Sequence, residues 1–218
     1  MKSVSFVKVV SLDLDGTLTT PSFVDAVWLE EIPRLYAIKN NLSIDHAKII
    51  VKGEYQKIGK ERLEWYDLSY WIQKFRLDVN TNTLLNKFRS RVTLYPDVPK
   101  ALQWLREKTY PIVLLTNAHR EFHRLELKEA NIAKYFKYIF SATSDFGMVK
   151  SQTAVYRKLC DYLKIAPHEL LHVGNDRYLD FIIPRKLGIL TYLLDRSNKE
   201  KGRHVIYSLT ELKKNLEK

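Results

Sequence analysis

The sequence predicts an α/β fold: a doubly wound, mainly parallel (Rossmann-like) sheet core with an inserted small α-helical domain. Three patterns support this prediction. Residues 5–13 form a short apolar and β-branched segment, residues 23–91 show only helical spacing of apolar side chains, and helices alternate strictly with strands after Pro96. Because parallel strands are joined by crossover helices that cover both faces of a sheet, this alternation indicates a parallel sheet.

The first strand is expected over residues 5–13 and is predicted to be buried on both faces, because apolar side chains point to either side of it. It ends at the turn-forming pair Asp15-Gly16. The middle third then changes period: Val24, Val27 and Trp28 have the i, i+3, i+4 spacing of an amphipathic helix. A small helical bundle is therefore predicted between the first strand and the rest of the sheet.

Four further strands are predicted at 112–116, 138–141, 170–173 and 189–194. The helices that alternate with them are predicted at 98–108, 121–130, 153–163 and 178–187. A last helix is expected to begin near Ser208, since Ser208 and Glu211 have the spacing of a capping box, which satisfies two free N–H groups. These elements assign residues 1–18 and 93–218 to the α/β core and residues 19–92 to the helical insertion.

Composition narrows the class of protein. The chain has 218 residues, of which 45% are hydrophobic and 12% aromatic, so it has enough apolar surface for a packed core and is not a disordered chain. No apolar run reaches the roughly 20 residues that cross a bilayer, and the first ten residues lack the pattern of a secretory signal. We therefore expect a soluble, cytoplasmic protein without a membrane partner.

The formal net charge of +11 favours an anionic partner, either a polyanion or a small anionic substrate. The 36 Lys and Arg residues are spread along the chain without a block of five or six, so nucleic acid is an unlikely partner. Cys160 is the only cysteine, which excludes an intramolecular disulfide and a cysteine-based zinc site. Its apolar helical surroundings predict a core residue.

Polar side chains follow several predicted strands at the edge where ligands bind to such sheets. They are Asp13 and Asp15 after the first strand, Thr116 and Asn117 after the second, Lys150 beyond the turn at Gly147, and Asn175, Asp176 and Asp180 after the fourth; Gly16 and Gly174 accompany them at the turns. Two carboxylates two residues apart at a strand end point to the same side, where they repel each other unless a cation lies between them. The set predicts a site for magnesium and a phosphoryl group.

These segments resemble the four motifs of the haloacid dehalogenase-like hydrolase superfamily. Asp13-Leu-Asp-Gly-Thr17 resembles its nucleophile motif, Thr116 its second motif, Lys150 its third, and His-Val-Gly-Asn-Asp-Arg-Tyr-Leu-Asp180 its acidic fourth. The long interval between Asp13 and Thr116 has room for the helical cap domain that this superfamily inserts there. The resemblance implies that residues 19–92 are this cap.

The resemblance also implies a role for each matched residue. Asp13 would attack phosphorus and form an aspartyl phosphate, while Asp15 would protonate the leaving oxygen and later deprotonate the attacking water. The substrate-binding residues would be Gly16, Thr116, Asn117 and Lys150. An acid two positions after the nucleophile favours a phosphatase or phosphomutase, because the dehalogenases of this superfamily lack it.

Mg²⁺ is the implied cofactor, and its candidate ligands are Asp13, Asp15, Asn175, Asp176 and Asp180. The fourth motif departs from the usual Gly-Asp, because Gly174 is followed by Asn175 and the acid comes one place later. Asn supplies a carbonyl oxygen without charge. Either Asn175 is a weak ligand or Asp176 takes its place, and both readings stay open at this point.

The predicted function is that of a magnesium-dependent phosphatase acting on a small phosphorylated metabolite through an aspartyl phosphate. The alternatives are a phosphomutase of the same superfamily and a basic binding or regulatory protein with the fold but little hydrolase activity. No Gly-x-Gly-x-x-Gly or Gly-x-x-x-x-Gly-Lys-Ser/Thr motif supports a dinucleotide or P-loop enzyme.

Other conspicuous residues are given structural interpretations. His119 and His123, four residues apart, are expected to be surface or substrate-contacting residues rather than a metal pair, and His172 is expected to be a satisfied core residue. The aromatic residues between Trp65 and Phe75 have helical spacing, which predicts the core of the helical domain, with one or two of them near the substrate entrance.

Overall fold

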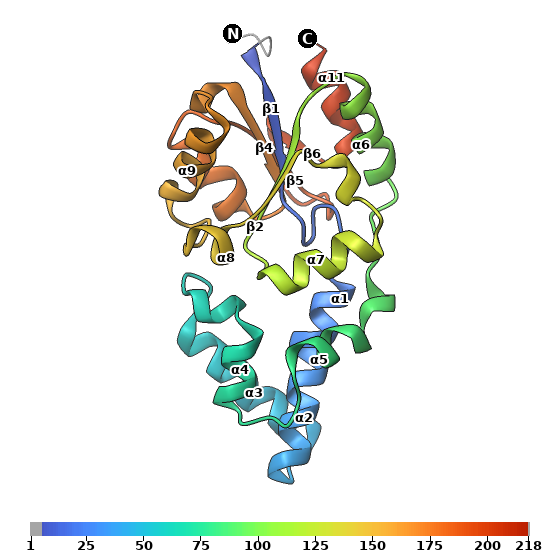
Figure 1. Ribbon diagram of the computed structural model, residues 1–218, viewed down its shortest axis with the longest axis vertical. Coiled ribbons are helices and arrows are strands. Elements are labelled where there is room, and N and C mark those ends of the chain that lie inside the picture. The colour runs from blue at the N-terminus through green and yellow to red at the C-terminus, as the bar shows by residue number, and fades with distance from the viewer. Residues whose placement is uncertain (1–5, 218) are drawn as a thin grey trace.

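The computed structural model describes residues 6–217 and contains a six-stranded, all-parallel sheet (Figure 1). Its strands are β1 (Val9–Leu12), β2 (Ile112–Thr116), β3 (Tyr138–Ser141), β4 (Leu170–Gly174), β5 (Leu190–Leu194) and β6 (Val205–Ile206). The spatial order β3-β2-β1-β4-β5-β6 runs outward from β1 in both directions, which confirms the predicted doubly wound sheet. The order reverses next to β1, and at that point the carboxyl ends of β1, β2 and β4 lie together.

The first strand is shorter than predicted, and the residue at which the prediction begins, Ser5, lies outside the described residues. All four residues of β1 are buried. Val10 and Leu12 belong to the apolar cluster on one face of the sheet, whereas Val9 belongs to the cluster on the other face. Burial on both faces is therefore confirmed.

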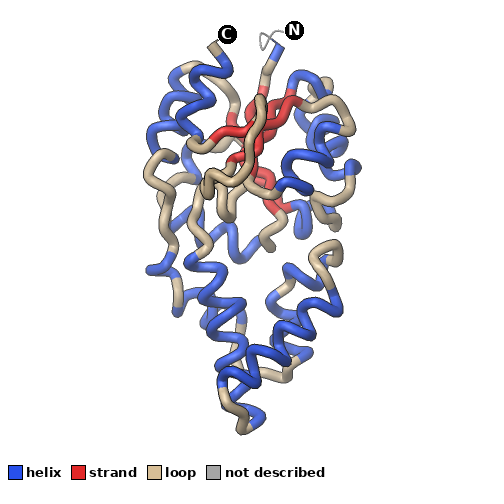
Figure 2. Tube along the Cα trace, turned by 180° about the vertical axis from the view of Figure 1, so that it is seen from behind, coloured by secondary structure: helices blue, strands red, loops and turns tan. Residues whose placement is uncertain are grey.

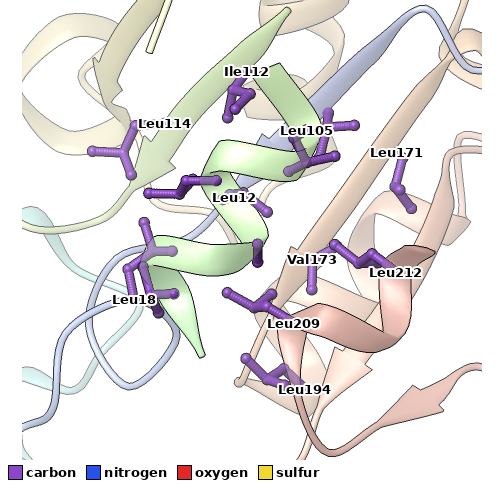
Figure 3. Packing of buried hydrophobic residues seen from close by; sticks show 14 of the residues in the cluster. Leu12, Leu18, Leu105, Ile112, Leu114, Leu171, Val173, Leu194, Leu209 and Leu212 are labelled. Carbon is purple, nitrogen blue, oxygen red and sulfur yellow. The ribbon is translucent and has the colours of Figure 1, made fainter. Parts of the chain in front are cut away.

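Helices cover the two faces of the sheet. One face packs against α6 (Val98–Glu107) and α11 (Leu212–Leu216), and Figure 3 shows Leu105 of α6 near Leu12 of β1 and Leu212 of α11 near Val173 of β4. The other face packs against α9 (Thr153–Leu163) and α10 (Ile183–Arg185). Cys160 is buried in this second cluster, as predicted.

Several details of the core differ from the prediction. The helix expected over 178–187 is a π-helical segment, Arg177–Ile182, followed by the short α10. Pro184, near the start of α10, has no N–H to donate to the preceding turn, which interrupts the regular hydrogen bonding of one long α-helix. The last helix begins with a 3₁₀ turn, Leu209–Glu211, and the predicted Ser208–Glu211 capping box is present. The short helix α8 (Ala142–Phe146) and the two-residue strand β6 are elements that the sequence pattern did not indicate.

The insertion is helical, and no strand occurs in it among the described residues. Its elements are α1 (Ser22–Asp25), a π-helical turn (Ala26–Glu31), α2 (Ile32–Asn40), α3 (Ile44–Ile58), a 3₁₀ turn (Leu63–Tyr66), α4 (Leu68–Lys74), α5 (Thr81–Lys87) and a second 3₁₀ turn (Arg89–Arg91). Side chains of Ser43, Asp67 and Asn80 accept backbone N–H bonds at the starts of α3, α4 and α5, which explains why these helices begin there.

These helices form a separate lobe below the sheet, as Figures 1 and 2 show from opposite sides. The chain passes between the two lobes twice, and these two connecting segments are joined by an isolated antiparallel β-bridge between Thr19 and Leu94. We propose 19–92 as the limits of this cap domain and 1–18 with 93–218 as the core. The cap has its own apolar cluster, in which Trp71 and Phe75 are buried. In residues 6–217, the helices are all too short or too polar to span a bilayer.

Candidate active site

The end of β1 presents two carboxyl groups. Asp13 is buried, and its backbone N–H donates to the carbonyl oxygen of Val173 on β4 at 3.0 Å. The chain then turns at Gly16, where φ is +77°. A Cβ at this position would lie 2.4 Å from Nδ2 of Asn175, so glycine is needed both for the turn and for the close approach of the loop after β4.

Lys150 lies at the centre of the site, with 2% of its surface exposed. Its Nζ donates to Oδ1 of Asp13 at 2.5 Å and to Oδ1 of Asp180 at 2.7 Å. Burial disfavours the charged ammonium, but the attraction of Asp13 and Asp180 outweighs it and raises the pKa of Lys150 above its ordinary value. The lysine is therefore a fixed positive charge between the first and fourth predicted motifs.

Asn117 positions the segment that carries this lysine. Its Oδ1 accepts a hydrogen bond from the backbone N–H of Lys150 at 2.9 Å, and its Nδ2 donates to the hydroxyl of Tyr66, a cap residue, at 3.0 Å. Thr116, which is 1% exposed, uses its hydroxyl oxygen to accept from the N–H of Ala118 at 2.9 Å. Both residues line the same cavity as Asp13 and Lys150.

Asp180 is held on all sides by donors. Its Oδ1 accepts from Lys150 and lies 3.1 Å from Nε2 of His172, and its Oδ2 accepts from the backbone N–H of Asp176 at 3.0 Å. Burial alone would raise the pKa of Asp180, but Lys150 and His172 outweigh burial and lower it. A Cβ at Gly174 would lie 2.3 Å from Cγ of Asp180, so this approach also requires glycine.

His172 is the satisfied core residue that the sequence predicts. It is fully buried, and its Nδ1 lies 3.0 Å from the hydroxyl of Ser11 while its Nε2 faces Asp180. Burial lowers the pKa of His172, so the ring is neutral at pH 7. The ring orients Asp180, which in turn holds Lys150.

His123 differs from the prediction that it is a surface or substrate-contacting residue. Only 4% of it is exposed, it lies outside the main cavity, and neither ring nitrogen has a hydrogen-bond partner within residues 6–217. His123 lies with Phe122, Glu126 and Leu127 on the buried face of α7 (Arg120–Glu129). His119 lies just before that helix, is partly exposed and lines the cavity, as expected for a substrate-contacting residue.

Asp13, the candidate nucleophile, is buried among several charged groups. Burial raises the pKa of Asp13 to about 7; Lys150 lowers it, whereas Asp180 and Asp15 raise it. Its Oδ2 accepts from the Thr17 hydroxyl at 3.1 Å, and the same hydroxyl oxygen lies 3.1 Å from Oδ1 of Asn175. One additional positive charge beside Asp13 would favour its ionised form.

Asp15 faces a second buried acid, Glu126 of α7, which is completely buried. Burial raises the pKa of Asp15 to about 6, and a hydrogen bond from Glu126 lowers it. Burial and the charge of Asp15 raise the pKa of Glu126 well above its ordinary value. Oδ1 of Asp15 and Oε1 of Glu126 lack any other donor among the described residues, so a proton held by Glu126 satisfies both.

Glu126 is the site residue that the sequence analysis missed. It lies one helical turn after the buried Phe122, so it occupies the inward face of α7, where an apolar residue is expected. The hydroxyl of Thr19 donates to its Oε2 at 2.8 Å, which fixes the other oxygen toward Asp15. A charged residue at an inward position of an amphipathic helix was the available signal.

The donor atoms near Asp13 fit a magnesium ion. Carboxylate, amide carbonyl and backbone carbonyl oxygens are the ligands that this hard cation prefers. A carboxylate oxygen of Asp13 and the amide oxygen of Asn175 both lie next to the Thr17 hydroxyl, so two suitable ligand oxygens are close together. Asp176 points elsewhere: its Oδ1 accepts from the N–H groups of Tyr178 and Leu179, at 2.8 and 2.9 Å. No cluster of three or more His, Cys, Asp or Glu side chains suited to a metal occurs in residues 6–217.

These residues form the floor of a cavity of about 670 Å³ between core and cap. The core contributes Asp13, Asp15, Thr116, Asn117, Ala118, His119, Phe122, Lys150, Asn175, Asp176, Leu179 and Asp180, and the cap contributes Val24, Asp25, Trp28, Leu29, Pro33, Lys48, Val51, Lys52, Tyr55, Gln56, Trp65 and Tyr66. Lys60 of the cap also reaches Oδ2 of Asp176 at 3.3 Å. The structure thus brings together every site residue that the sequence predicts except Gly16, which lies beside the cavity and supports the loop.

The fold and site define an α/β protein with carboxylates and a buried lysine at the carboxyl ends of parallel strands, beneath a helical cap. The family model of the haloacid dehalogenase-like hydrolases matches residues 7–181 of the sequence, and the chain belongs to this family of hydrolases.

Curated relatives with named activities are distant in sequence. The GMP/IMP nucleotidase YrfG of Escherichia coli is 25% identical over 169 residues, 78% of this chain and 74% of that protein. A glyceraldehyde 3-phosphate phosphatase of Pyrococcus furiosus is 25% identical, over 97% of this chain and 94% of that protein. Two (S)-2-haloacid dehalogenases also match.

Solved structures support the same fold. The crystal structure of a HAD phosphatase from Thermococcus onnurineus superposes with a TM-score of 0.85 at 25% identity, covering 96% of this chain and 98% of that chain. The L-2-haloacid dehalogenase of Xanthobacter autotrophicus gives a TM-score of 0.67 at 17% identity, over 97% of this chain and 98% of that chain, and at this identity it shows the fold alone.

Proposed function

We propose that this hydrolase is a magnesium-dependent phosphatase that cleaves small phosphate monoesters through an aspartyl phosphate. The observation that supports it best is the pairing of Asp13 with the buried Lys150, at 2.5 Å, while a second carboxyl, Asp15, lies in the same cavity. A halide leaves without a proton, whereas the leaving oxygen of a phosphate ester needs a group that protonates it.

In the first step, a carboxylate oxygen of Asp13 attacks phosphorus, and the bond between phosphorus and the leaving oxygen breaks. Asp15 gives its proton to that oxygen, so the product leaves as a neutral alcohol. Burial raises the pKa of Asp15 to about 6, which keeps part of this carboxyl protonated near neutral pH. Lys150 attracts the phosphoryl oxygens and offsets their charge beside Asp13.

In the second step, water attacks the phosphorus of the aspartyl phosphate, and Asp15, now ionised, accepts the proton of that water. The bond between phosphorus and the Asp13 oxygen breaks, which releases inorganic phosphate and restores both acids. Thr116 and Asn117 line the cavity beside Lys150 and are the proposed contacts to the phosphoryl group.

Asp13, the backbone carbonyl of Asp15 and Asn175 would hold the magnesium ion, which supplies positive charge that lets an anionic carboxylate approach an anionic phosphate. Asp180 is assigned to orienting Lys150, because both of its oxygens already accept hydrogen bonds. Asp176 is assigned to capping the segment that begins at Arg177.

The substrate is proposed to be a small phosphorylated metabolite. The names of two relatives suggest nucleoside monophosphates, as for the nucleotidase, or a triose phosphate, as for the glyceraldehyde 3-phosphate phosphatase. A phosphomutase would share the first step and differ in the acceptor, so product analysis separates the two functions: free phosphate indicates a phosphatase, and an isomerised sugar phosphate indicates a mutase.

The test is release of phosphate from p-nitrophenyl phosphate by the purified protein, with magnesium and with a chelator, and by the Asp13→Asn variant. We expect turnover that requires both magnesium and Asp13, with a loss of about 10³-fold or more in the variant. Circular dichroism and thermal unfolding of the variant show whether it remains folded. Equal activity of the folded variant would exclude Asp13 as the nucleophile.

A further inference from the structure

We propose that the substrate's organic part is a flat ring system whose outer edge carries an oxygen acceptor. This inference rests on the proposed phosphatase function, because it takes the phosphate end as bound by the residues of the core. It concerns the opposite wall of the cavity, which the cap supplies and which no motif of the sequence describes.

Aromatic side chains dominate that wall. Trp28, Tyr55, Trp65 and Tyr66 of the cap and Phe122 of the core all line the cavity. Trp28 stacks on Phe122 with ring centroids 5.5 Å apart and 8° between the planes, and Tyr55 meets Trp28 edge-on at 5.9 Å. Trp28 and Trp65 remain only half-buried, so part of each indole is open to a ligand. Aromatic faces of this kind favour flat rings, which stack on them.

The wall is held in a fixed position above the acids. Tyr66 accepts the hydrogen bond from Asn117, whose other end holds the backbone of Lys150. The 3₁₀ turn Leu63–Tyr66 that carries Trp65 is thereby tied to the catalytic floor. A phosphate bound at Lys150 therefore has its ester group directed along a preformed aromatic surface.

The size of the cavity agrees with a ring rather than with a short chain. About 670 Å³ lies within the range of pockets that enclose ligands of several ring atoms. A three-carbon phosphate ester would leave the aromatic wall in contact with water, and the burial of that wall by a ring gives the hydrophobic contribution to binding.

Two lysine side chains indicate which chemical group the edge of the substrate ring carries. Lys48 and Lys52 lie one turn apart on α3, line the cavity and are exposed. Neither makes a salt bridge with any residue in the part of the chain that the structure describes, whereas Lys57 of the same helix pairs with Glu54. Because a lysine ammonium only donates hydrogen bonds, the pair favours a carbonyl or anionic oxygen over an amino group.

The matched substrates that test the ring are ribose 5-phosphate and inosine 5′-monophosphate, which share the sugar and the phosphate ester and differ in the base. We expect kcat/KM to be about tenfold or more higher for the ring-bearing ester. Adenosine 5′-monophosphate tests the edge, since an amino group replaces the ring carbonyl; we expect it to be about threefold or more poorer than the inosine ester.

Substitutions test which residues cause these substrate preferences. Trp28→Ala and Trp65→Ala should bring the ratio of the ring-bearing ester to ribose 5-phosphate toward one. Tyr162→Ala, at an exposed core tyrosine that does not line the cavity, should keep the ratio of the unchanged protein. Lys48→Gln and Lys52→Gln should reduce the preference for the carbonyl, and Lys57→Gln on the same helix is their control.

A binding measurement keeps the result separate from turnover. In the folded Asp13→Asn variant, tryptophan fluorescence should report a dissociation constant for inosine 5′-monophosphate about tenfold or more below that for ribose 5-phosphate. Equal constants, or equal kcat/KM values with active protein, overturn the ring proposal and leave the phosphatase proposal intact. Tighter binding of hexyl phosphate than of the ring-bearing ester also overturns it, in favour of an alkyl substrate. Ring-selective binding without phosphate release from any ester supports the ring and overturns the phosphatase.

Discussion

The floor and the wall of the cavity are built on different principles. On the floor, supplied by the core, nearly every buried polar atom has a partner: Lys150 bonds to Asp13 and Asp180, and Asp180 also faces His172. On the wall, supplied by the cap, apolar and aromatic side chains meet two exposed lysines. In the proposed function, the floor supplies the charges that the reaction needs, and the wall determines which ester is bound. Substitutions on the floor should therefore abolish chemistry, and those on the wall should change specificity.

Among the floor substitutions, Asp15→Asn should have the largest effect on kcat relative to its effect on KM. Loss of the group proposed to donate and accept the proton should lower kcat by about 10²- to 10⁴-fold with little change in KM. Steady-state kinetics with p-nitrophenyl phosphate and with an alkyl phosphate check this, and the alkyl ester should suffer more because its leaving oxygen needs the proton more.

The control for that experiment is Asp78→Asn, at an exposed cap carboxylate outside the cavity. An Asp15→Asn enzyme with the kcat of the control would remove Asp15 from the proton transfers.

Lys150→Met tests whether the floor also stabilises the fold. The substitution leaves Asp13 and Asp180 buried without their shared cation, and breaking such a buried pair costs about 3–5 kcal/mol. Urea unfolding near pH 7 measures the change in unfolding free energy. Lys57→Met is matched to it, because it removes one exposed pair with Glu54 and should cost less than about 1 kcal/mol. Similar losses in the two variants would contradict the structural role of Lys150.

His123 is a buried polar group of the core in which neither ring nitrogen has a hydrogen-bond partner in residues 6–217. Burial lowers the pKa of His123 from 6.5 to about 4. Between these values the unfolded chain binds a proton that the folded protein does not, so this group makes stability fall as the pH drops from about 6.5 to 4. The loss should reach about 3 kcal/mol at most.

Unfolding free energies measured across that pH range, for the unchanged protein and for His123→Leu, check this. The leucine variant should lose that part of the pH dependence and should be the more stable protein at pH 5, because it buries no unpaired nitrogen. Parallel pH profiles for the two proteins would contradict the prediction.

Substitutions at the candidate metal ligands should have a smaller effect. Asn175→Asp places a second carboxylate beside Asp13, and the added charge should lower the magnesium concentration for half-maximal activity about tenfold. Asp176→Asn should change that concentration less than about twofold, because Asp176 caps a helical segment. The reverse pattern would assign the metal to Asp176 instead.

The sequence predicted the floor better than the wall for a physical reason. Asp13 and Thr116 stand at the ends of apolar strand segments, and parallel strands bring their ends to one edge of the sheet. Lys150 was identified by its position after the turn at Gly147. The alternation of strands and helices along the core and the helical nature of the insertion were predicted from the periodicity of apolar residues. Strand β6 was missed because two residues carry no periodicity.

The arrangement of the wall depends on contacts between distant segments, such as Trp28 on Phe122, which no local pattern reveals. Glu126 is a similar case, because its role depends on its contact with Asp15, which lies in the turn after β1 and is far from Glu126 in the sequence. His123 was misplaced because its helix was expected to turn that face to solvent.

Glu126 therefore offers the finest test of how the floor is organised. Glu126→Gln keeps a side-chain N–H that can donate to Asp15 and a carbonyl that can accept from Thr19, so kcat should stay within about threefold of the unchanged protein. Glu126→Ala removes both bonds and leaves Asp15 unsupported, and kcat should fall about tenfold at constant KM. A glutamine variant as impaired as the alanine variant would mean that the exchangeable proton of Glu126 is needed, and not only the hydrogen bond that orients Asp15.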